Sequence, residues 1–181
     1  DLDRDQWLQV RKGGIGSSDA AAAVGLNPYQ SQLELWMEKT GRAPTAPPGD
    51  GGADDQSPMY WGSLLEPIVA AHYTRRTGNR VRRINAVLQH PEHPWMLANI
   101  DREVLGAPDV QLLECKTAGI QGAWLWRDGV PEYVQLQEQH QLAVTGKQAA
   151  DVAVLLGGQE LQIFRIERDE ELIAQLITLE R

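Results

Sequence analysis

The chain of 181 residues has one cysteine, one phenylalanine and no long apolar run. A single cysteine, Cys115, excludes an internal disulfide framework. No apolar stretch approaches the roughly 20 residues that a membrane-spanning helix needs, and no signal peptide is visible. The chain begins at Asp1 without a methionine, so we expect a trimmed N-terminus. The sequence therefore predicts a protein that folds without disulfides and outside a membrane.

Motifs of several common enzyme classes are missing. The glycine-rich segment 13–19 lacks the Gly-Lys-Ser/Thr ending of a nucleotide-binding P-loop, which argues against ATP binding. No Gly-x-Ser-x-Gly turn is present, and Ser17-Ser18 has no arrangement of triad partners. The histidines form no zinc spacing with cysteine; they are His72, His90, His93 and His140. A metabolic enzyme is thereby disfavoured, because no cofactor motif supports one.

Positive charge is scarce overall, since the net charge is −8 and the pI is near 5.0. Taken alone, this argues against a nucleic-acid-binding protein. The charge is unevenly distributed, however, with five arginines within residues 75–83 and acids concentrated at 50–55 and 167–171. Such a polarised chain can bind DNA on one face and repel it elsewhere. The arginine cluster is equally consistent with a solvated helix end.

The length suggests a single domain over residues 1–181, with a mobile loop rich in Pro, Gly and Asp at about 43–58. The helix predicted over 60–77 has an apolar stripe that includes Leu64, Ile68 and Tyr73. The order of elements predicts an α/β (α+β) fold with a mixed central sheet flanked by helices. Helices are expected at about 5–10, 20–24, 31–40, 60–77, 131–146 and 170–179. Strands are expected at about 81–88, 95–100 with an extension over 103–105, 110–116, 151–156 and 159–166.

The most informative segment runs from Asp101 to Lys116. Apolar and polar residues alternate around Glu114, so Glu114 and Lys116 leave one face of a strand together. Asp101 is expected on the neighbouring strand of a meander. Two carboxylates and an ammonium at one point can hold Mg²⁺ and activate a water for phosphodiester cleavage. Without further support, Glu114 and Lys116 could equally form a surface ion pair.

Other residues have both a chemical and a structural interpretation. Glu66 is either a surface residue of its helix or a carboxylate aimed at the metal. Gln137 and Gln141 are i, i+4 neighbours that either hold a water or phosphate or form a solvated face. Arg11 and the loop 13–19 form either a phosphate cradle or an ordinary capped helix start.

In chain order these segments resemble the YqaJ viral recombinase family, the phage lambda exonuclease-like branch of the PD-(D/E)XK nucleases. The resemblance covers roughly residues 5–165. Its motifs are Arg-x-x-x-Ile-Gly-Ser-Ser-Asp (11–19), Trp-Gly-x-x-Leu-Glu-Pro (61–67), Ala-Asn-Ile-Asp-Arg (98–102), Leu-Glu-Cys-Lys-Thr (113–117), and Pro-x-Tyr (131–133) with Gln-x-Gln-His-Gln (137–141) and Val-Thr-Gly (144–146). Five ordered motifs make a chance match improbable, so we expect a restriction-endonuclease-like PD-(D/E)XK core.

The resemblance implies roles for individual residues. The implied metal ligands are Asp101, Glu114, the backbone carbonyl of Cys115, and Glu66 directly or through water. Lys116 is implied as the catalytic lysine and Gln137 as the glutamine that helps to orient the attacking water. The implied 5′-phosphate and DNA contacts are Arg11, Ser18, Asn99, Gln141, Arg75 and Arg76. At Asn99-Ile100-Asp101 the chain departs from the Ser-Pro-Asp of lambda exonuclease, although Asn99 can still donate a hydrogen bond.

The family implies a Mg²⁺-dependent 5′→3′ exonuclease that uses two ions, accepts Mn²⁺ and degrades double-stranded DNA ends to 3′ overhangs for phage-type recombination. Its implied partner is a phage single-strand annealing protein. It implies a homotrimeric ring whose basic channel reconciles DNA binding with the acidic net charge. The implied location is the bacterial cytoplasm, for a phage or prophage protein. The alternatives are a PD-(D/E)XK endonuclease and a non-catalytic DNA-end-binding protein.

Overall fold

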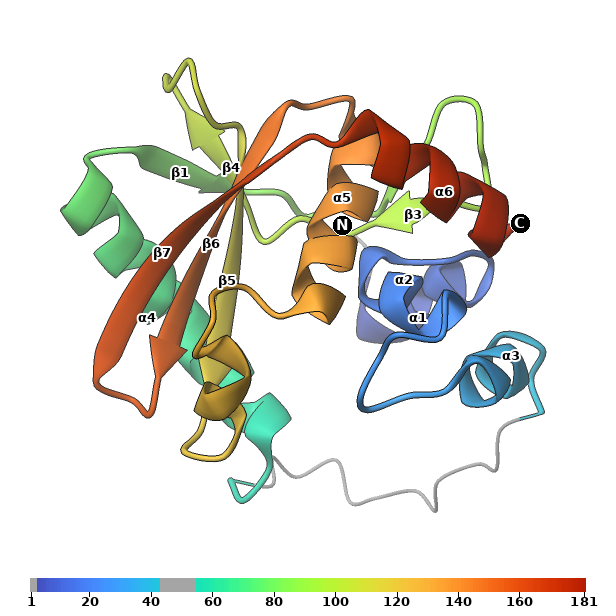
Figure 1. The fold of residues 1–181 in the computed structure, drawn as a ribbon, viewed down its shortest axis with the longest axis horizontal. Coiled ribbons are helices and arrows are strands. Elements are labelled where there is room, and N and C mark those ends of the chain that lie inside the picture. Colours follow the sequence, from blue (N-terminus) through green and yellow to red (C-terminus); the bar gives the residue numbers. More distant parts are fainter. Residues whose placement is uncertain (1–2, 43–54) are drawn as a thin grey trace.

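The computed structural model describes residues 3–42 and 55–181 (Figure 1). Most of the predicted loop at 43–58 lies outside the described residues. The helices are α1 (Arg4–Lys12), α2 (Ala20–Ala23), α3 (Gln32–Lys39), α4 (Pro58–Thr77), α5 (Glu132–Thr145) and α6 (Glu170–Glu180), with short 3-10 helices η1 (Ser17–Asp19) and η2 (Gly122–Trp126). The strands are β1 (Arg80–Arg83), β2 (Leu88–Gln89), β3 (Leu97–Ala98), β4 (Arg102–Leu105), β5 (Leu112–Ala118), β6 (Ala149–Leu156) and β7 (Glu160–Glu167).

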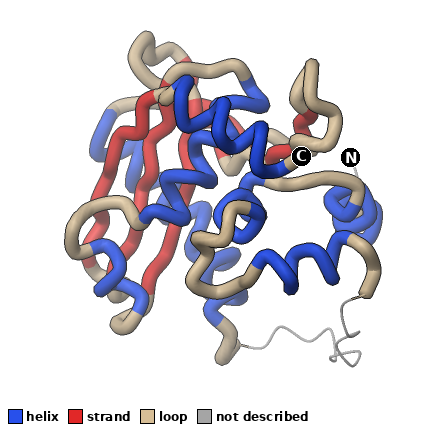
Figure 2. The backbone as a smooth tube through the Cα atoms, turned by 45° about the vertical axis from the view of Figure 1, so that its right-hand side comes forward, coloured by secondary structure: helices blue, strands red, loops and turns tan. Residues whose placement is uncertain are grey.

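Five strands form the central sheet in the order β1-β4-β5-β6-β7, and β2 pairs with β3 in a separate ribbon. The sheet is mixed, because β5 and β6 are parallel while the other neighbours are antiparallel. Figure 2 shows the strands side by side, with the N-terminal helices, α5 and α6 beside the sheet. The predicted α+β fold with a mixed sheet and flanking helices is therefore confirmed.

The sheet separates two apolar clusters. Val152 and Val154 of β6 belong to the cluster that includes Val134 and Leu142 of α5. Ala153, between them, belongs to the cluster formed with α4. Because β6 is covered on both faces, its sequence is a nearly continuous apolar run and does not alternate between apolar and polar residues. α5 lies in the connection between parallel β5 and β6, which is the usual way to join parallel strands.

The strand expected at 81–88 is wrong, since it divides into β1 and β2, which belong to different sheets. The strand expected at 95–100 is reduced to β3, and its expected extension over 103–105 is instead a separate strand, β4, in the central sheet. Met96 and Ile100 are nevertheless buried in the core. The apolar residues of this region are therefore explained by burial in the core and not by pairing in the central sheet. η2 was not anticipated from the sequence.

The position of α4 is well marked by its ends: the Ser57 side chain caps its first turn, and Gly78 at φ 76° ends it. Its predicted apolar stripe is only half right. Val69 and Tyr73 are buried against the sheet, whereas Leu64 and Ile68 are each 49% exposed. The buried face places Glu66 beside the sheet, near Arg102 at the start of β4.

Candidate active site

Glu114 of β5 is held by two amides from α5. Gln137 Nε2 donates to Glu114 Oε1 at 3.1 Å, and Gln141 Nε2 donates to Glu114 Oε2 at 3.0 Å. Lys116 Nζ donates to Gln137 Oε1 at 2.8 Å and lies 3.5 Å from Glu114 Oε1. Glu114 and Lys116 thus share one face of β5, as the alternation predicted, and they face α5 rather than bulk solvent.

Asp101 immediately precedes β4, whose residue Arg102 pairs with Leu113 on β5. This register places Asp101 opposite Glu114. Asp101 Oδ2 accepts a 3.0 Å hydrogen bond from the backbone N–H of Cys115. Burial and then the charge of Glu114 raise the pKa of Asp101 to about 7, although the Cys115 N–H and Lys116 act in the opposite direction. A cation between the two carboxyls would relieve this unfavourable electrostatic arrangement.

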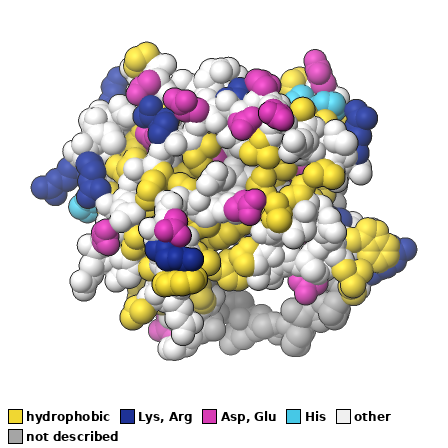
Figure 3. All heavy atoms as spheres, viewed as in Figure 1, with side chains coloured by type: hydrophobic (Ala, Val, Ile, Leu, Met, Phe, Trp, Pro, Cys, Tyr) yellow, Lys and Arg dark blue, Asp and Glu magenta, His cyan; other side chains and the backbone are white. Residues whose placement is uncertain are grey.

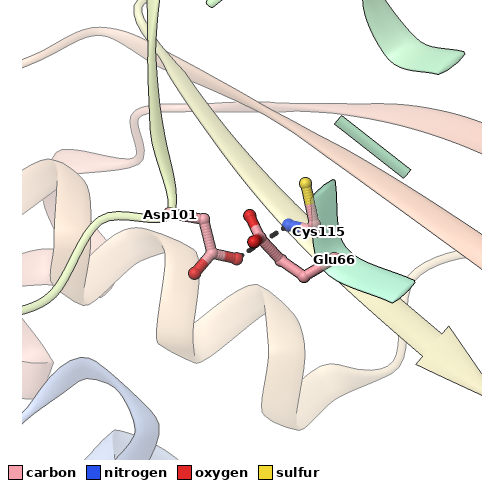
Figure 4. Close-up of side chains that lie close together, drawn as sticks. All are labelled: Glu66, Asp101 and Cys115. Atoms are coloured by element: carbon pink, nitrogen blue, oxygen red, sulfur yellow. Dashed lines mark hydrogen bonds between the residues drawn. The ribbon is translucent and has the colours of Figure 1, made fainter. Parts of the chain in front are cut away.

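Glu66 of α4 completes the acidic group. One carboxylate oxygen of Glu66, one of Asp101 and the thiol sulfur of Cys115 all lie within 4.8 Å of one another. Figure 4 shows them converging from α4, from the start of β4 and from β5. Glu66 is also paired with Arg102 at 2.6 Å and with Arg83 at 3.6 Å. The interpretation of Glu66 as a surface residue is therefore wrong.

The donors at this site fit a hard divalent cation. Burial, then Asp101 and Glu66, raise the pKa of Cys115, which keeps its thiol protonated and a poor metal ligand. Carboxylate oxygens remain, and Mg²⁺ prefers one or two of them together with water. The surrounding cavity of about 490 Å³ has room for water and a phosphate, and it is lined by all three acids and Lys116. The expected backbone ligand at Cys115 stays a prediction.

Two titratable side chains next to the acids, Lys116 and Glu138, influence the electrostatics of the site. Burial lowers the pKa of Lys116, but Glu114, Glu138 and Asp101 raise it by more, so the lysine is an ammonium. Glu138 is fully buried, and neither of its carboxyl oxygens has a hydrogen-bond partner in the described part of the chain. Burial and then Glu114 raise the pKa of Glu138 well above its usual range. Sequence reasoning missed Glu138, whose only signal is its place within the glutamine motif.

The residues of the predicted phosphate cradle lie around Arg11, and phosphate binding there stays a prediction. Arg11 Nη2 donates to Ser18 Oγ at 2.7 Å, and its guanidinium lies 4.5 Å from the ring centroid of Trp7. Arg11 Nε is buried and has no partner among the described residues, so a donor remains available. Lys39, which sequence reasoning missed, pairs with Asp19 at 2.9 Å and donates to the Arg11 carbonyl at 3.0 Å.

The cradle and the acidic site are tied to the same helix, because η1 and α2 pack against α5. Asp19 Oδ2 also accepts from the Gly16 N–H at 2.9 Å, which fixes the loop before η1. The described structure thus brings Arg11 and Ser18 together and connects them through α5 to Glu114.

The other predicted DNA contacts are dispersed. Gln141 is fully buried between Glu114 and the Asn99 carbonyl, which it meets at 3.5 Å, so its direct partner is the acid rather than a surface ligand. Arg76 donates to the Leu161 carbonyl at 2.5 Å, and Arg75 is exposed at the end of α4. Figure 3 shows Lys and Arg side chains gathered at the left edge of that view, where Figure 1 places the end of α4 and β1. The helix rise puts Arg75 about 14 Å along α4 from Glu66.

No helix within the described residues is both long and apolar enough to span a bilayer.

Several known structures share this fold. An alkaline exonuclease (LHK-Exo) from Laribacter hongkongensis superposes with a TM-score of 0.75 at 26% identity, covering 97% of this chain and 88% of that one. The same enzyme in complex with dAMP gives 0.73 over the same coverage. A phage-related exonuclease from Haemophilus somnus 129PT matches at 0.58 with 10% identity, over 92% of this chain and 91% of that one, which supports the fold alone. The expected PD-(D/E)XK type of core is thus confirmed.

Sequence comparison gives the family. The chain is 42% identical over 183 residues to the uncharacterized protein YqaJ of Bacillus subtilis (strain 168), covering 99% of this chain and 55% of the relative. It therefore spans about half the length of that curated relative. A family model described as the YqaJ-like viral recombinase domain matches residues 6–148. The chain belongs to the YqaJ-like viral recombinase domain family, as its ordered motifs predicted.

Proposed function

We propose that this protein is a Mg²⁺-dependent 5′→3′ exonuclease that resects double-stranded DNA ends to 3′ overhangs for phage-type recombination. The observation that carries the proposal is the convergence of Asp101, Glu114 and Lys116 in one cavity, with Gln137 joining the last two. We infer exonuclease activity from the structural similarity to an enzyme named as an alkaline exonuclease. Mn²⁺ would substitute for Mg²⁺, because the donors are oxygen atoms.

The acids would hold the metal, and the α5 amides of Gln137 and Gln141 would hold Glu114 in place. Asp101, Glu114 and the Cys115 carbonyl would bind one ion, with Glu66 contributing directly or through water to two-ion binding. Bound Mg²⁺ lowers the pKa of a coordinated water and offsets charge on the phosphate. Lys116, as an ammonium, orients the attacking water and stabilises the developing phosphate charge. Gln137 fixes the direction of the Lys116 ammonium.

Direction of degradation would come from the Arg11 cradle. A terminal 5′-phosphate would accept hydrogen bonds from Arg11 Nε and Ser18. Asn99 is a further candidate contact, since it lines a cavity together with Trp7, the ring beside Arg11. Arg75 and Arg76 would contact the duplex backbone farther along α4, with Arg83 nearer the acids.

The biological setting follows the family. A phage single-strand annealing protein would bind the exposed 3′ strand in the cytoplasm of a bacterial host, for a phage- or prophage-encoded enzyme. A homotrimeric ring would confine DNA to a basic channel and leave the acidic surfaces outside, which is consistent with the net charge of −8.

The decisive experiment is digestion of end-labelled linear duplex with Mg²⁺, comparing 5′-phosphate ends, 5′-hydroxyl ends and covalently closed circles. We expect fast release of mononucleotides from 5′-phosphate ends, slower release from 5′-hydroxyl ends and intact circles. Cleavage of closed circles would favour the endonuclease alternative. Binding of ends without any hydrolysis would favour a non-catalytic end-binding protein.

A further inference from the structure

One face of α5 continues past the residues that hold Glu114 and Lys116. Tyr133, Gln137 and Gln141 are spaced at i, i+4 and i+8, so they form a row along the helix. Gln141 and Gln137 both bind Glu114, and Gln137 also binds Lys116. Tyr133 is therefore one helical turn beyond the catalytic amide, on the same side of the helix.

Tyr133 supports a second aromatic ring from a different part of the chain. The Tyr29 ring meets the Tyr133 ring edge-on, with a centroid distance of 5.7 Å and an interplanar angle of 89°. Tyr133 itself is half-buried and packs against the apolar cluster around Ala21 and Leu136. Its position is thus fixed by the core, and it holds Tyr29 in place.

The loop that carries Tyr29 is also held by hydrogen bonds. The Asn27 side chain accepts from the Tyr29 N–H at 2.7 Å, and the Leu26 N–H bonds the Ala21 carbonyl at 2.7 Å. Tyr29 nevertheless remains 68% exposed. An aromatic ring is therefore presented to solvent in a fixed orientation rather than folded into the core.

Tyr133, the ring that supports Tyr29, lies within the electrostatic range of the catalytic lysine. Burial and then Tyr29 raise the pKa of Tyr133, while Lys116 lowers it. This agrees with the helical spacing, which puts Tyr133 next to Gln137. A nucleotide whose phosphate lies at Lys116 would have its base within reach of this side of the site.

We propose that Tyr29, supported from behind by Tyr133, is a stacking subsite for a nucleobase of the strand being cut, adjacent to the scissile phosphate. This rests on the proposed nuclease function. Residues 26–31 carry no charged side chain, so the loop is unsuited to binding phosphate. An exposed aromatic face suits any base, because stacking is tolerant of sequence, as an enzyme that degrades DNA from an end requires.

The test compares Tyr29→Leu with Tyr29→Phe on linear 5′-phosphorylated duplex, with and without abasic nucleotides at the end. Removing a stacked ring should lower kcat/KM about tenfold on normal DNA, whereas Tyr29→Phe should stay near the wild type. On abasic ends the two variants and the wild type should be equal, because no base is left to stack. Trp36→Leu is the matched control, an exposed tryptophan on the adjacent helix α3 that is covered by Arg42 and should leave base dependence unchanged.

A binding measurement separates the subsite from catalysis. With Ca²⁺ replacing Mg²⁺ to suppress cleavage, 2-aminopurine at the terminal nucleotide should be quenched by the wild type and by Tyr29→Phe but not by Tyr29→Leu. An equal loss for Tyr29→Leu on normal and abasic ends would overturn the stacking subsite and indicate a structural role. If the wild type degrades DNA and Tyr29→Leu has the same rates and the same quenching, the stacking subsite is refuted but the proposed nuclease function is not. Wild-type protein with no hydrolysis would refute the proposed function, whatever the quenching shows.

Discussion

Gln137 joins Glu114 and Lys116 through opposite ends of one amide, donating to the carboxylate at 3.1 Å and accepting from the ammonium at 2.8 Å. An amide is suited to this position because it can donate and accept at once without adding charge. Both side chains are thereby oriented by contacts within the protein itself. Catalysis depends on such preorganisation of charged groups around the reacting phosphate.

Replacing Gln137 with Leu should therefore lower kcat by about 100-fold while changing DNA affinity little. The variant leaves the Lys116 ammonium without its acceptor and Glu114 with one fewer donor. Single-turnover cleavage of end-labelled duplex measures the chemical step, and a filter-binding assay in Ca²⁺ measures affinity. Gln135→Leu is the matched control, since Gln135 is exposed on the same helix and donates only to the Val130 carbonyl. Equal losses in the two variants would contradict the assigned role.

The raised pKa of Asp101 predicts how stability changes with pH in metal-free protein. Folded Asp101 titrates at about 7 instead of 3.8, so the folded state holds a proton that the unfolded chain releases. Raising the pH from about 4 to about 7 in EDTA should therefore lower the free energy of unfolding. Asp101→Asn removes this titration, so we expect it to abolish cleavage yet to be about 2 kcal/mol more stable than wild type at pH 8.

Urea unfolding at pH 5 and pH 8, with EDTA or with Mg²⁺, measures this effect. Mg²⁺ should stabilise the wild type at pH 8, because the cation binds the ionised carboxyl, and should do little for Asp101→Asn. A wild-type protein that gains stability between pH 5 and pH 8 in EDTA would show that other groups dominate.

The sequence was sufficient for residues whose surroundings are local. Alternation around Glu114 placed Lys116 on the same side of β5, and the helix spacing put Gln137 and Gln141 on one face. It could not give the strand breaks near Ile84, because burial there comes from long-range packing rather than from pairing. The role of Lys39 could not be predicted from the sequence either, because its partners Asp19 and Arg11 lie 20 and 28 residues away along the chain.

Lys39 gives a prediction about selection of DNA ends. Its side chain is only 13% exposed and connects Asp19 to the Arg11 carbonyl, so it is placed to position Arg11. Lys39→Met should reduce the preference for 5′-phosphate over 5′-hydroxyl ends about tenfold, because a displaced Arg11 loses a charged hydrogen bond to the phosphate. The rate on 5′-hydroxyl ends should be nearly unchanged.

The ratio of initial rates on the two ends measures this preference. Lys39→Arg should restore part of it, and Lys12→Met, at an exposed lysine of α1, should leave it intact. If Lys39→Met slows both ends equally, the ion pair serves stability alone. Breaking a nearly buried pair is also expected to cost about 3 kcal/mol of unfolding free energy, so each variant is assayed below its Tm.

Glu138 predicts a gain of stability on substitution. Its carboxyl is fully buried without a hydrogen-bond partner among the described residues, which is an unfavourable environment for either protonation state. Glu138→Leu keeps a similar volume and removes the polar group, so we expect the unfolding free energy to rise by about 1–2 kcal/mol at pH 8. The gain in unfolding free energy should shrink as the pH falls, because the raised pKa of Glu138 lets the folded wild type take up a proton there at low pH.

Glu132→Leu, at an exposed position of the same helix, controls for helix propensity and should change stability little at either pH. A Glu138→Leu protein less stable than wild type at pH 8 would mean that the carboxyl has an essential partner, such as an internal water, that offsets its burial.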